Sequence, residues 1–469
     1  MTKSKRKRMK LDLQKACDTF LNDMSRSVVC HIQLELPFNT DCTSVRKTIN
    51  VRSKVENLQS KLFHAAKQSL DRKFGALYDK IYRGDILLEA YAKVKKNNGA
   101  PGVDKIDFFT IEEEIGIENF LFEIQTELKE ETYKASPVRR KWITKSGKTE
   151  KRPLGIPIIK DRVIQMAAKL ILEPIFETNF LEDSYGYRPN KSPSDAIRKI
   201  QRVINFRGQR AVIDADIKGY FENINHKLLM NLLQRRINDQ RVLKLIQDWL
   251  KSGVIDNGEE FKGSNMGTPQ GGVISPLLAN IYLHSFDKMF QLSGINGTLV
   301  RYCDDFVILL KGNAKNVQSE IEKMLSRLGL ELNHDKTKIT NAEKGFDFLG
   351  IHFRLCESKR KTAKIRHYCR QWPSNESIIR IHTRVNEVIG RRYSLSLEEL
   401  IPELNLVIRG WNNYLKRACY FKSKRYSKLN QFVRERIRNF IKRKYNDQSR
   451  SNRRLSHNLL IKLGLCQFG

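Results

Sequence analysis

The sequence predicts mixed secondary structure, with a larger body of short strands and helices followed by a smaller helical domain. From about residue 138 to 355, strand-like segments alternate with segments of helical period, which indicates an α/β or α+β body. After Phe353 the apolar positions keep helical spacing among many basic residues, which predicts a small basic helical domain. A chain of 469 residues is long enough for two or more domains with cores of their own.

The charge of the chain is strongly unbalanced. Its 86 Lys and Arg against 52 Asp and Glu give a formal net charge of +34, which indicates a polyanionic partner. Nucleic acid is favoured over an anionic membrane, because no apolar run reaches spanning length and no signal peptide is visible. The eight cysteines are scattered without a CxxC pair or a Cys/His cluster, which is typical of reduced intracellular thiols and argues against a zinc site.

The N-terminal part begins with a basic arm and continues as helices. The opening MTKSKRKRMK has six basic residues and no acid, so it is either a solvated disordered arm, an RNA-contacting arm or a nuclear signal. Residues 52–98 have the apolar spacing of helices, and the Gly/Pro-containing NNGAPGVD (97–104) ends them. Further along, the pattern predicts strands at 140–144 and 209–217 and amphipathic helices at 161–177 and 226–237.

The C-terminal part carries much of the positive charge. Residues 401–469 hold 17 Lys and Arg but only three Asp and Glu. An apolar stripe at helical spacing comprises Leu429, Val433, Ile437, Phe440 and Ile441. Other faces of the same helix carry Arg434, Arg436, Arg438, Lys442 and Arg443. This basic side either contacts RNA or is only a solvated charged face.

Acidic residues in two strand-like segments are the candidates for chemistry. LVRYCDDFVILL (299–310) has the pattern of a β-hairpin with Asp304 and Asp305 at the tight turn, although Asp is common in turns. In AVIDADI, alternation places Asp214 and Asp216 on one strand face, where they repel unless a cation or a basic side chain compensates. If this strand lies beside the hairpin, three or four carboxylates converge into an all-oxygen site that suits Mg²⁺. Two such ions about 3.5–4 Å apart are typical of a nucleotidyl transferase.

A glycine-rich segment, NMGTPQGGVISPLLANIYL (265–283), precedes a predicted helix. Gly267, Gly271 and Gly272 let the backbone pass close to something bulky, and Ser275 is a candidate N-cap. Alone, this pattern favours a structural turn over nucleotide contact.

A series of blocks resembles, in order, the reverse transcriptases encoded by group II introns, the intron maturases. The blocks are KVENLQSKLFHAAKQ, RKFGALYDKIYR, NNGAPGVDKI, TYKASPVRRKWI, KRPLGIPIIKDRVIQ, FLEDSYGYRPNKSPSDAI, DADIKGYFENINHKLLM, GTPQGGVISPLLANIYL, RYCDDFVIL, LGLELNHDKTKI, FDFLGIHF and IRGWNNYL, spanning about residues 52–440. The resemblance implies an α+β right-hand polymerase with fingers, palm and an α-helical thumb/maturase domain. The implied domains are a basic arm (1–50), N-terminal extension and fingers (51–210), palm (211–355) and thumb/maturase or X domain (356–469).

The resemblance also implies an activity and its partners. These are RNA-directed DNA polymerisation with two Mg²⁺ ions, for which Mn²⁺ can substitute, on an RNA template with a DNA primer and dNTPs. Binding of the parent intron RNA, help in its splicing, retrohoming into DNA and a cytoplasmic, bacterial setting in a ribonucleoprotein are implied as well. Two alternatives remain: a domesticated relative in phage defence, CRISPR adaptation or DNA repair, and a non-polymerising splicing cofactor.

The metal site implied by the resemblance has four members. Asp216 corresponds to the first metal-binding aspartate, and the carbonyl of Ile217 is a further ligand. Asp304 and Asp305 correspond to the YxDD pair, with Asp304 the firmer ligand. Asp214 has no catalytic counterpart and is expected to be a same-face neighbour.

The implied nucleotide site draws on two motifs. Phe221, five residues after Asp216, corresponds to the aromatic ring under the sugar, where a 2′-hydroxyl would collide with it. This favours dNTPs over NTPs and disfavours an RNA-templated RNA polymerase. Gln270 in TPQGG corresponds to the residue that lines the incoming nucleotide.

Basic residues complete the implied contacts. Lys145 and Arg152 correspond to the pair that holds the triphosphate, although the loop is one residue longer than usual and Lys148 or Lys151 are alternatives. Lys336 is expected near the palm as an RNA or primer contact, with a surface lysine as the alternative. Arg434, Arg438 and Lys442 are the corresponding candidates in the helical domain.

The sequence departs from the family pattern at two places. Cys303 stands where the YxDD motif usually has Ala, and a small buried thiol is expected to fit the same slot. Many members carry a C-terminal HNH nuclease with clustered His and Cys, whereas residues 441–469 hold only His457 and Cys466. We therefore expect a group II-type reverse transcriptase without that nuclease.

Overall fold

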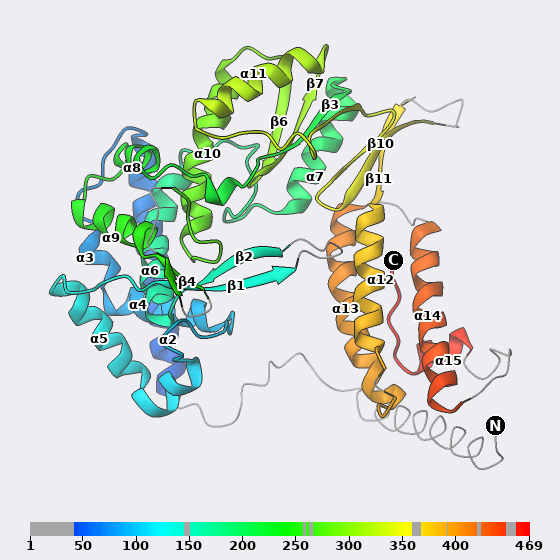
Figure 1. The fold of residues 1–469 in the computed structure, drawn as a ribbon, viewed down its shortest axis with the longest axis horizontal. Helices are drawn as coiled ribbons and strands as arrows, with labels where there is room; N and C mark the ends of the chain where they lie inside the picture. The colour runs from blue at the N-terminus through cyan, green and yellow to red at the C-terminus, as the bar shows by residue number, and fades with distance from the viewer. Residues whose placement is uncertain are drawn as a thin grey trace. The chain divides into compact units, whose positions relative to one another are not determined.

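The computed structural model describes residues 42–144, 151–256, 259–261, 266–358, 367–391, 393–419, 424–446 and 456–469. These divide into two compact units, one ending at Asn341 and the other beginning at Ala342 (Figure 1). The α+β class predicted from the sequence is confirmed, and a C-terminal helical region follows the strands. The domain boundaries, including the end of the palm at residue 355, stay predictions.

The N-terminal part of the first unit is helical, as its apolar spacing predicts. Its α-helices are α2 (Cys42–Gln68), α3 (Tyr78–Ile81), α4 (Gly84–Lys95), α5 (Ile117–Lys129) and α6 (Ile159–Glu177), with a π-helical turn at Thr110–Ile115. Helix α6 is buried along most of its length and contacts α2, α3 and α4. It therefore forms the centre of this helical layer.

The first unit also contains two sheets. The smaller has the order β2-β1-β4-β5, formed by β1 (Val138–Thr144), β2 (Lys151–Ile156), β4 (Val254–Asp256) and β5 (Glu259–Phe261). The larger has the order β6-β7-β3-β8, formed by β3 (Ala211–Asp216), β6 (Gly297–Tyr302), β7 (Asp305–Leu310) and β8 (Lys338–Asn341). All neighbours in this second sheet are antiparallel, and β7 is buried on both faces after its first residue, as a central strand should be.

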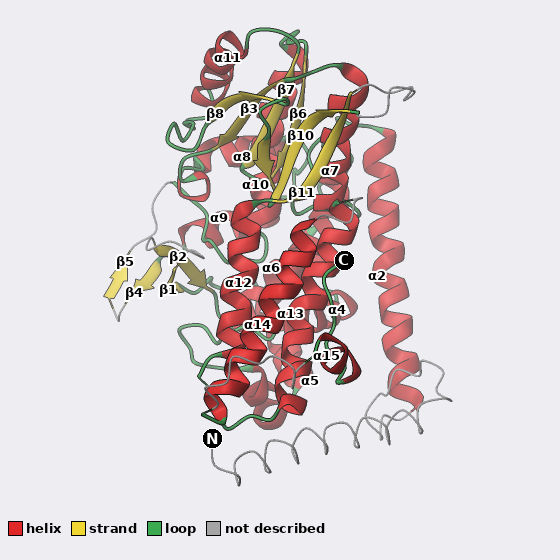
Figure 2. Cartoon of the chain, turned by 90° about the vertical axis from the view of Figure 1, so that its right-hand side faces the viewer, coloured by secondary structure: helices red, strands yellow, loops and turns green. Residues whose placement is uncertain are grey.

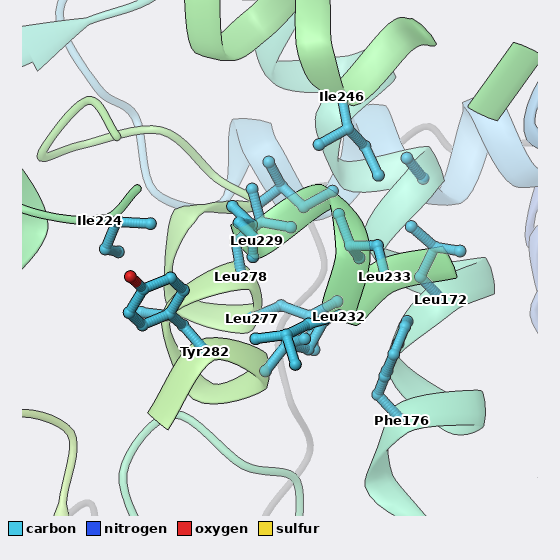
Figure 3. Close-up of a cluster of buried hydrophobic side chains, with 14 of the residues drawn as sticks. Leu172, Phe176, Ile224, Leu229, Leu232, Leu233, Ile246, Leu277, Leu278 and Tyr282 are labelled. Carbon is cyan, nitrogen blue, oxygen red and sulfur yellow. The ribbon is translucent and has the colours of Figure 1, made fainter. Parts of the chain in front are cut away.

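The described residues of this unit contain five further α-helices and a π-helical turn at Val203–Arg207. The α-helices are α7 (Pro193–Arg202), α8 (His226–Gln234), α9 (Gln240–Lys251), α10 (Ser275–Leu292) and α11 (Ala314–Ser326). Helix α7 packs on β6 and α11 packs on β3. Side chains of α6, α8, α9 and α10 meet in the hydrophobic cluster of Figure 3, whose members include Phe176, Leu229, Ile246, Leu278 and Tyr282. This cluster joins α6 of the helical layer to α8, α9 and α10.

The second unit consists of a small sheet and a helical bundle (Figure 2). The sheet has the order β11-β10-β9, formed by β9 (Phe346–Phe348), β10 (Ile351–Glu357) and β11 (His367–Pro373). The helices are α12 (Asn375–Ile389), α13 (Leu397–Ala418), α14 (Lys424–Lys444) and α15 (His457–Lys462). The predicted stripe on α14 is buried, and α12 packs against both α13 and α14.

Three asparagines of this bundle hold the last residues of the chain. Asn405, Asn412 and Asn430 each donate a side-chain N–H to a backbone carbonyl of residues 464–469 and each accept one backbone N–H from it, at 2.6 to 3.2 Å. The segment thereby has a fixed place although it forms no sheet. Within the described residues, no helix is both long and apolar enough to cross a membrane.

Candidate active site

The acidic hairpin forms as predicted, with one correction. Strands β6 and β7 pair so that Tyr302 lies opposite Asp305, which leaves Cys303 and Asp304 as a two-residue loop. The prediction that both aspartates occupy the turn is therefore wrong, because cross-strand pairing makes Asp305 the first residue of β7. Cys303 has a φ of +61°, a conformation that residues other than glycine rarely adopt. The thiol is buried, so the small side chain fits its slot as expected.

The register of β3 brings the third carboxylate to the hairpin. Asp216, the last residue of β3, lies directly opposite Asp305 in the antiparallel pair. Residues opposite each other in such a pair have Cα atoms about 4.5–5.5 Å apart. Asp216 at the end of β3, Asp305 at the start of β7 and Asp304 in the loop before it thus converge, although Asp216 and Asp304 are 88 positions apart in sequence. Asp214 lies one pleat further back, opposite Val307.

Two of the converging carboxyl groups, those of Asp304 and Asp305, have raised pKa values. Burial, followed by the charges of Asp304 and Asp216, holds the pKa of Asp305 well above its usual range. Burial also raises the pKa of Asp304, against the lowering effect of its own backbone N–H and of a hydrogen bond from the Cys303 thiol. Raised pKa values in carboxyl groups that lie together are typical of functional sites.

Among the described residues, Lys336 brings a positive charge to the site. Lys336 donates from Nζ to Oδ2 of Asp216, and Asn333 donates its backbone N–H to the Asp216 carbonyl at 2.8 Å. The pKa of Lys336 is raised, because the bond to Asp216, together with the charges of the neighbouring aspartates, outweighs the lowering effect of burial. The structure therefore places Lys336 on a predicted metal ligand; its contact with RNA or primer stays a prediction.

The donor set fits a hard divalent cation. No three His, Cys, Asp or Glu side chains stand in a ready-made metal-holding group anywhere in the described parts of the chain. Carboxylate oxygens are nevertheless the ligands that Mg²⁺ takes, and the Lys336 ammonium group on Asp216 marks a position where positive charge is favoured. Ile217, buried and bridged to Leu332, directly follows Asp216, and its carbonyl stays a predicted ligand.

The predicted sugar-contacting ring lies next to this site in sequence and is tied to the glycine-rich segment. Phe221 belongs to a 3₁₀ turn, Tyr220–Glu222, and its ring meets Tyr220 edge to face at 5.4 Å. Tyr220 is buried and donates to the carbonyl of Ala279 at 2.6 Å. The Phe221 carbonyl accepts from the Thr268 N–H at 2.8 Å. The half-buried ring is thus held by two neighbouring elements.

The glycine-rich segment passes close to backbone, as predicted: Gly271 lies against strand β2, and Gly267 lies against the backbone of Glu222. The Gly155 N–H donates to the Gln270 carbonyl at 2.7 Å. A Cβ on Gly271 would lie 2.3 Å from the Gly155 carbonyl oxygen, and Gly271 has a φ of +121°. Gln270 is half-buried and lines a cavity of about 290 Å³ together with Pro153. Ser275 is not the N-cap of α10, because its hydroxyl donates to the Pro269 carbonyl instead.

The basic residues expected on the triphosphate are only partly described. Lys145 and Lys148 lie outside the described residues. Lys151 and Arg152 begin β2 and are exposed. The pKa of Tyr187 is raised, first by burial and then by the charges of Cys303 and Asp304. The charge of Arg152 partly opposes this rise.

Tyr187 is a residue near the site that the sequence did not single out. It is 54% exposed and has a φ of +55°, a strained backbone of the kind found at functional sites. The block FLEDSYGYRPN contains it, but nothing in one sequence shows which tyrosine adopts that conformation.

The basic candidates in the helical unit share one face of α14. Arg434, Arg438 and Lys442 follow at intervals of four residues and are half-buried. Burial and the charge of Arg438 lower the pKa of Arg434. Their contact with RNA stays a prediction.

An antiparallel sheet with carboxylates on two adjacent strands and on the hairpin loop beside them, a neighbouring glycine-rich loop and a following helical unit are features of template-directed polymerases of the right-hand class. Residues 143–353 match the family model for reverse transcriptase (RNA-dependent DNA polymerase), and residues 378–458 match the maturase-specific domain of group II introns. The chain belongs to the group II intron reverse transcriptases and maturases, as predicted, and is an RNA-directed DNA polymerase.

Curated relatives agree with this assignment. Protein YkfC of Escherichia coli is 34% identical over 337 residues, covering 63% of this chain and 87% of that protein. The group II intron-encoded protein LtrA of Lactococcus lactis is 33% identical over 362 residues, covering 62% of this chain and 59% of LtrA. An uncharacterized 91 kDa protein in the cob intron of Schizosaccharomyces pombe is 28% identical over 453 residues, covering 79% of this chain and 54% of that protein. The match thus spans less than two thirds of the last two relatives.

Proposed function

We propose that the chain extends a DNA primer on an RNA template, with Asp216, Asp304 and Asp305 as the metal-binding catalytic residues. The observation that carries this proposal is the register that sets Asp216 opposite Asp305 beside the Asp304 turn. Bound there, two Mg²⁺ ions, or Mn²⁺ in their place, would activate the primer's 3′-hydroxyl and stabilise the leaving pyrophosphate. The carbonyl of Ile217 is the further ligand.

The protein's own residues prepare this site. The Lys336 ammonium group neutralises part of the charge on Asp216 and keeps that carboxylate oriented towards the turn. Phe221 excludes a 2′-hydroxyl, Gln270 lines the nucleotide, and Arg152, with Lys145 before it, holds the triphosphate. The hydrogen bonds that tie Phe221 to Thr268 and Gln270 to β2 support the idea that these groups act as one nucleotide pocket.

The helical unit is proposed to bind intron RNA and assist its splicing. The match of residues 378–458 to the maturase-specific domain supports this role, as do the net charge of +34 and the basic face of α14. The basic arm of residues 1–50, the fingers of 51–210, the palm of 211–355 and the thumb/maturase domain of 356–469 are the domain assignments that accompany it. Retrohoming, and association with a ribonucleoprotein in a bacterial cytoplasm, belong to the same proposal.

The alternatives differ in how the site is used. A domesticated enzyme in antiphage defence, CRISPR adaptation or repair would use the same polymerase site without a parent intron. A non-polymerising splicing cofactor would not need the site, so three converging carboxylates, two of them with raised pKa values, argue against it.

Primer extension tests the proposal. Purified protein with an RNA template, a DNA primer, dNTPs and Mg²⁺ should extend the primer. Asp304→Ala combined with Asp305→Ala should abolish extension while RNA affinity stays within about twofold, because charge is removed only at the site. Exposed Asp335 is the matched control, and Asp335→Asn should behave as the unchanged protein. Extension by the double alanine variant would contradict the assignment.

A further inference from the structure

A completely buried arginine, Arg301, donates a hydrogen bond to the backbone of the turn that carries Asp304. Arg301 in β6 is 0% exposed and forms an ion pair with Asp287 of α10, at 2.7 and 2.5 Å. Its other N–H groups donate to Ser184 Oγ at 2.7 Å, Asn280 Oδ1 at 3.2 Å and the Cys303 carbonyl at 3.0 Å. A guanidinium group has five N–H donors, and the five bonds use all of them.

Stability alone does not explain this arrangement. Replacing a buried ion pair by apolar side chains of similar volume is often neutral or stabilising, whereas removing one partner is strongly destabilising. A guanidinium group is, however, rigid and planar, and it fixes several partners in one geometry. We therefore look for the role of Arg301 in the groups that it orients rather than in the stability that it adds.

The oriented group is the peptide that leads into Asp304. Arg301 bonds the carbonyl of Cys303, and that carbonyl belongs to the peptide unit whose nitrogen is Asp304's own. The φ of +61° at Cys303 is unfavourable for a residue with a side chain and persists only where the surroundings enforce it. The bond from Arg301, two residues earlier in the chain, supplies such a constraint.

A glycine closes the turn from another side. A Cβ on Gly186 would lie 2.5 Å from the backbone nitrogen of Cys303, so only glycine allows this approach. The Gly186 carbonyl accepts from Asn280 Nδ2 at 2.7 Å, and the Tyr185 N–H donates to the Arg301 carbonyl at 2.9 Å. Asn280 thus bonds both the Arg301 guanidinium group and Gly186, and both of these contact the backbone of Cys303 in the turn.

We propose that Arg301, with Asp287 and Asn280, is a positioning residue that sets the Cys303–Asp304 peptide so that Asp304 and Asp305 face Asp216 in a geometry that binds divalent cations. The inference rests on the proposed metal site and adds how its geometry is kept. It predicts that the buried network controls metal affinity more than it controls folding. Groups that orient metal ligands typically affect metal affinity or activity by about 10- to 100-fold.

The decisive variant combines Arg301→Met with Asp287→Leu, which removes the ion pair without leaving one charge unpaired. Its unfolding temperature should stay within a few degrees of the unchanged protein, and its RNA affinity should be kept. The Mg²⁺ concentration for half-maximal primer extension should rise by about 10- to 100-fold, with a matching loss of Mg²⁺ affinity in calorimetry without substrate. Arg301→Lys, with three donors and no planar fork, should be intermediate.

Two further variants separate positioning from folding. Arg236 is another buried arginine, and it caps backbone carbonyls at the end of α2, so Arg236→Met should lower the unfolding temperature and leave the Mg²⁺ requirement unchanged. Gly186→Ala pushes on the Cys303 backbone without touching the ion pair, and Gly186 has no positive φ of its own to strain. It should raise the Mg²⁺ requirement as the double variant does, and it decides the matter if the double variant fails to fold.

The outcomes are distinct. A folded double variant, or a folded Gly186→Ala variant, with the Mg²⁺ requirement and Mg²⁺ affinity of the unchanged protein overturns the positioning role. If the unchanged protein extends no primer but binds Mg²⁺, the proposed polymerase function fails, and the calorimetric comparison still decides the positioning role. Absence of Mg²⁺ binding in the unchanged protein overturns both.

Discussion

Replacing Asp161 by Asn should change how the free energy of unfolding depends on pH. Asp161, at the start of α6, is buried and accepts hydrogen bonds from the Tyr133 hydroxyl at 2.7 Å and the Ser136 N–H at 3.0 Å. Burial raises its pKa from 3.8 to about 6, against the lowering effect of these bonds, and the charge of Asp104 raises it further while Lys160 lowers it. Between pH 3.8 and about 6, the folded protein therefore keeps a proton on Asp161 that the unfolded chain has already released.

The sign and size of this pH dependence follow from the difference between the pKa of Asp161 in the folded protein and its pKa in the unfolded chain. Because the folded-state pKa is the higher one, this group's contribution to stability is present below about pH 4 and is lost as the pH rises through 6. A shift of about two pKa units corresponds to about 3 kcal/mol in total, of which about 2 kcal/mol falls between pH 4.5 and 7.5. Relative to Asp161→Asn, the unchanged protein should lose that amount of unfolding free energy over this interval.

Urea unfolding provides the assay. Tryptophan fluorescence is a suitable signal, because Trp249 donates from Nε1 to the Tyr133 hydroxyl at 3.0 Å beside the titrating carboxyl group. Asp335→Asn, at an exposed position, should follow the pH dependence of the unchanged protein. Parallel curves for Asp161→Asn and the unchanged protein would refute the reasoning.

Three further predictions test the nucleotide and RNA contacts. Phe221→Val should raise rNTP incorporation relative to dNTPs by at least about 10-fold in primer extension; an unchanged ratio would remove the sugar-gate assignment. Gly271→Ala should raise the KM for dNTPs by about 10-fold or more, because the new Cβ collides with the β2 backbone. Gly294→Ala has the same kind of positive φ but open space around it, so it should leave that KM unchanged, and equal effects would contradict the prediction. Changing Arg434 and Arg438 to Gln should reduce the slope of log affinity for intron RNA against log salt concentration by about two, because each arginine is expected to neutralise one phosphate group. An unchanged slope would show that this face of α14 does not contact RNA phosphates.

Local patterns predicted the elements that form the fold. The alternation in residues 209–217 indicated strand β3, the helical spacing of 161–177 indicated α6, and the apolar flanks of the acidic pair indicated the β6–β7 hairpin. These signals depend on neighbours in sequence, which is why they were visible. The sequence alone could predict that Asp216 meets the hairpin only if the two strands pair. The structure shows that β3 and β7 do pair, with Asp216 opposite Asp305.

What the sequence did not show depends on interactions between distant residues. The sequence did not single out Arg301, because its partner Ser184 lies 117 positions earlier in the chain and its partners Asn280 and Asp287 belong to helix α10. The sequence pattern predicts Asp305 in the turn, whereas strand register decides where a hairpin loop begins. Lys336 lies 120 positions from Asp216, so no local pattern could reveal their bond.

Calorimetric titration with Mg²⁺ tests the central claim most directly, because it detects the proposed ion site without requiring polymerisation. The unchanged protein and the Asp335→Asn control should bind Mg²⁺ with the same affinity. Asp216→Asn and Asp305→Asn should each weaken that binding by about 10-fold or more, since each removes a carboxylate ligand from the same site. Equal Mg²⁺ affinity in all four proteins would contradict the assignment of these aspartates to a divalent-cation site.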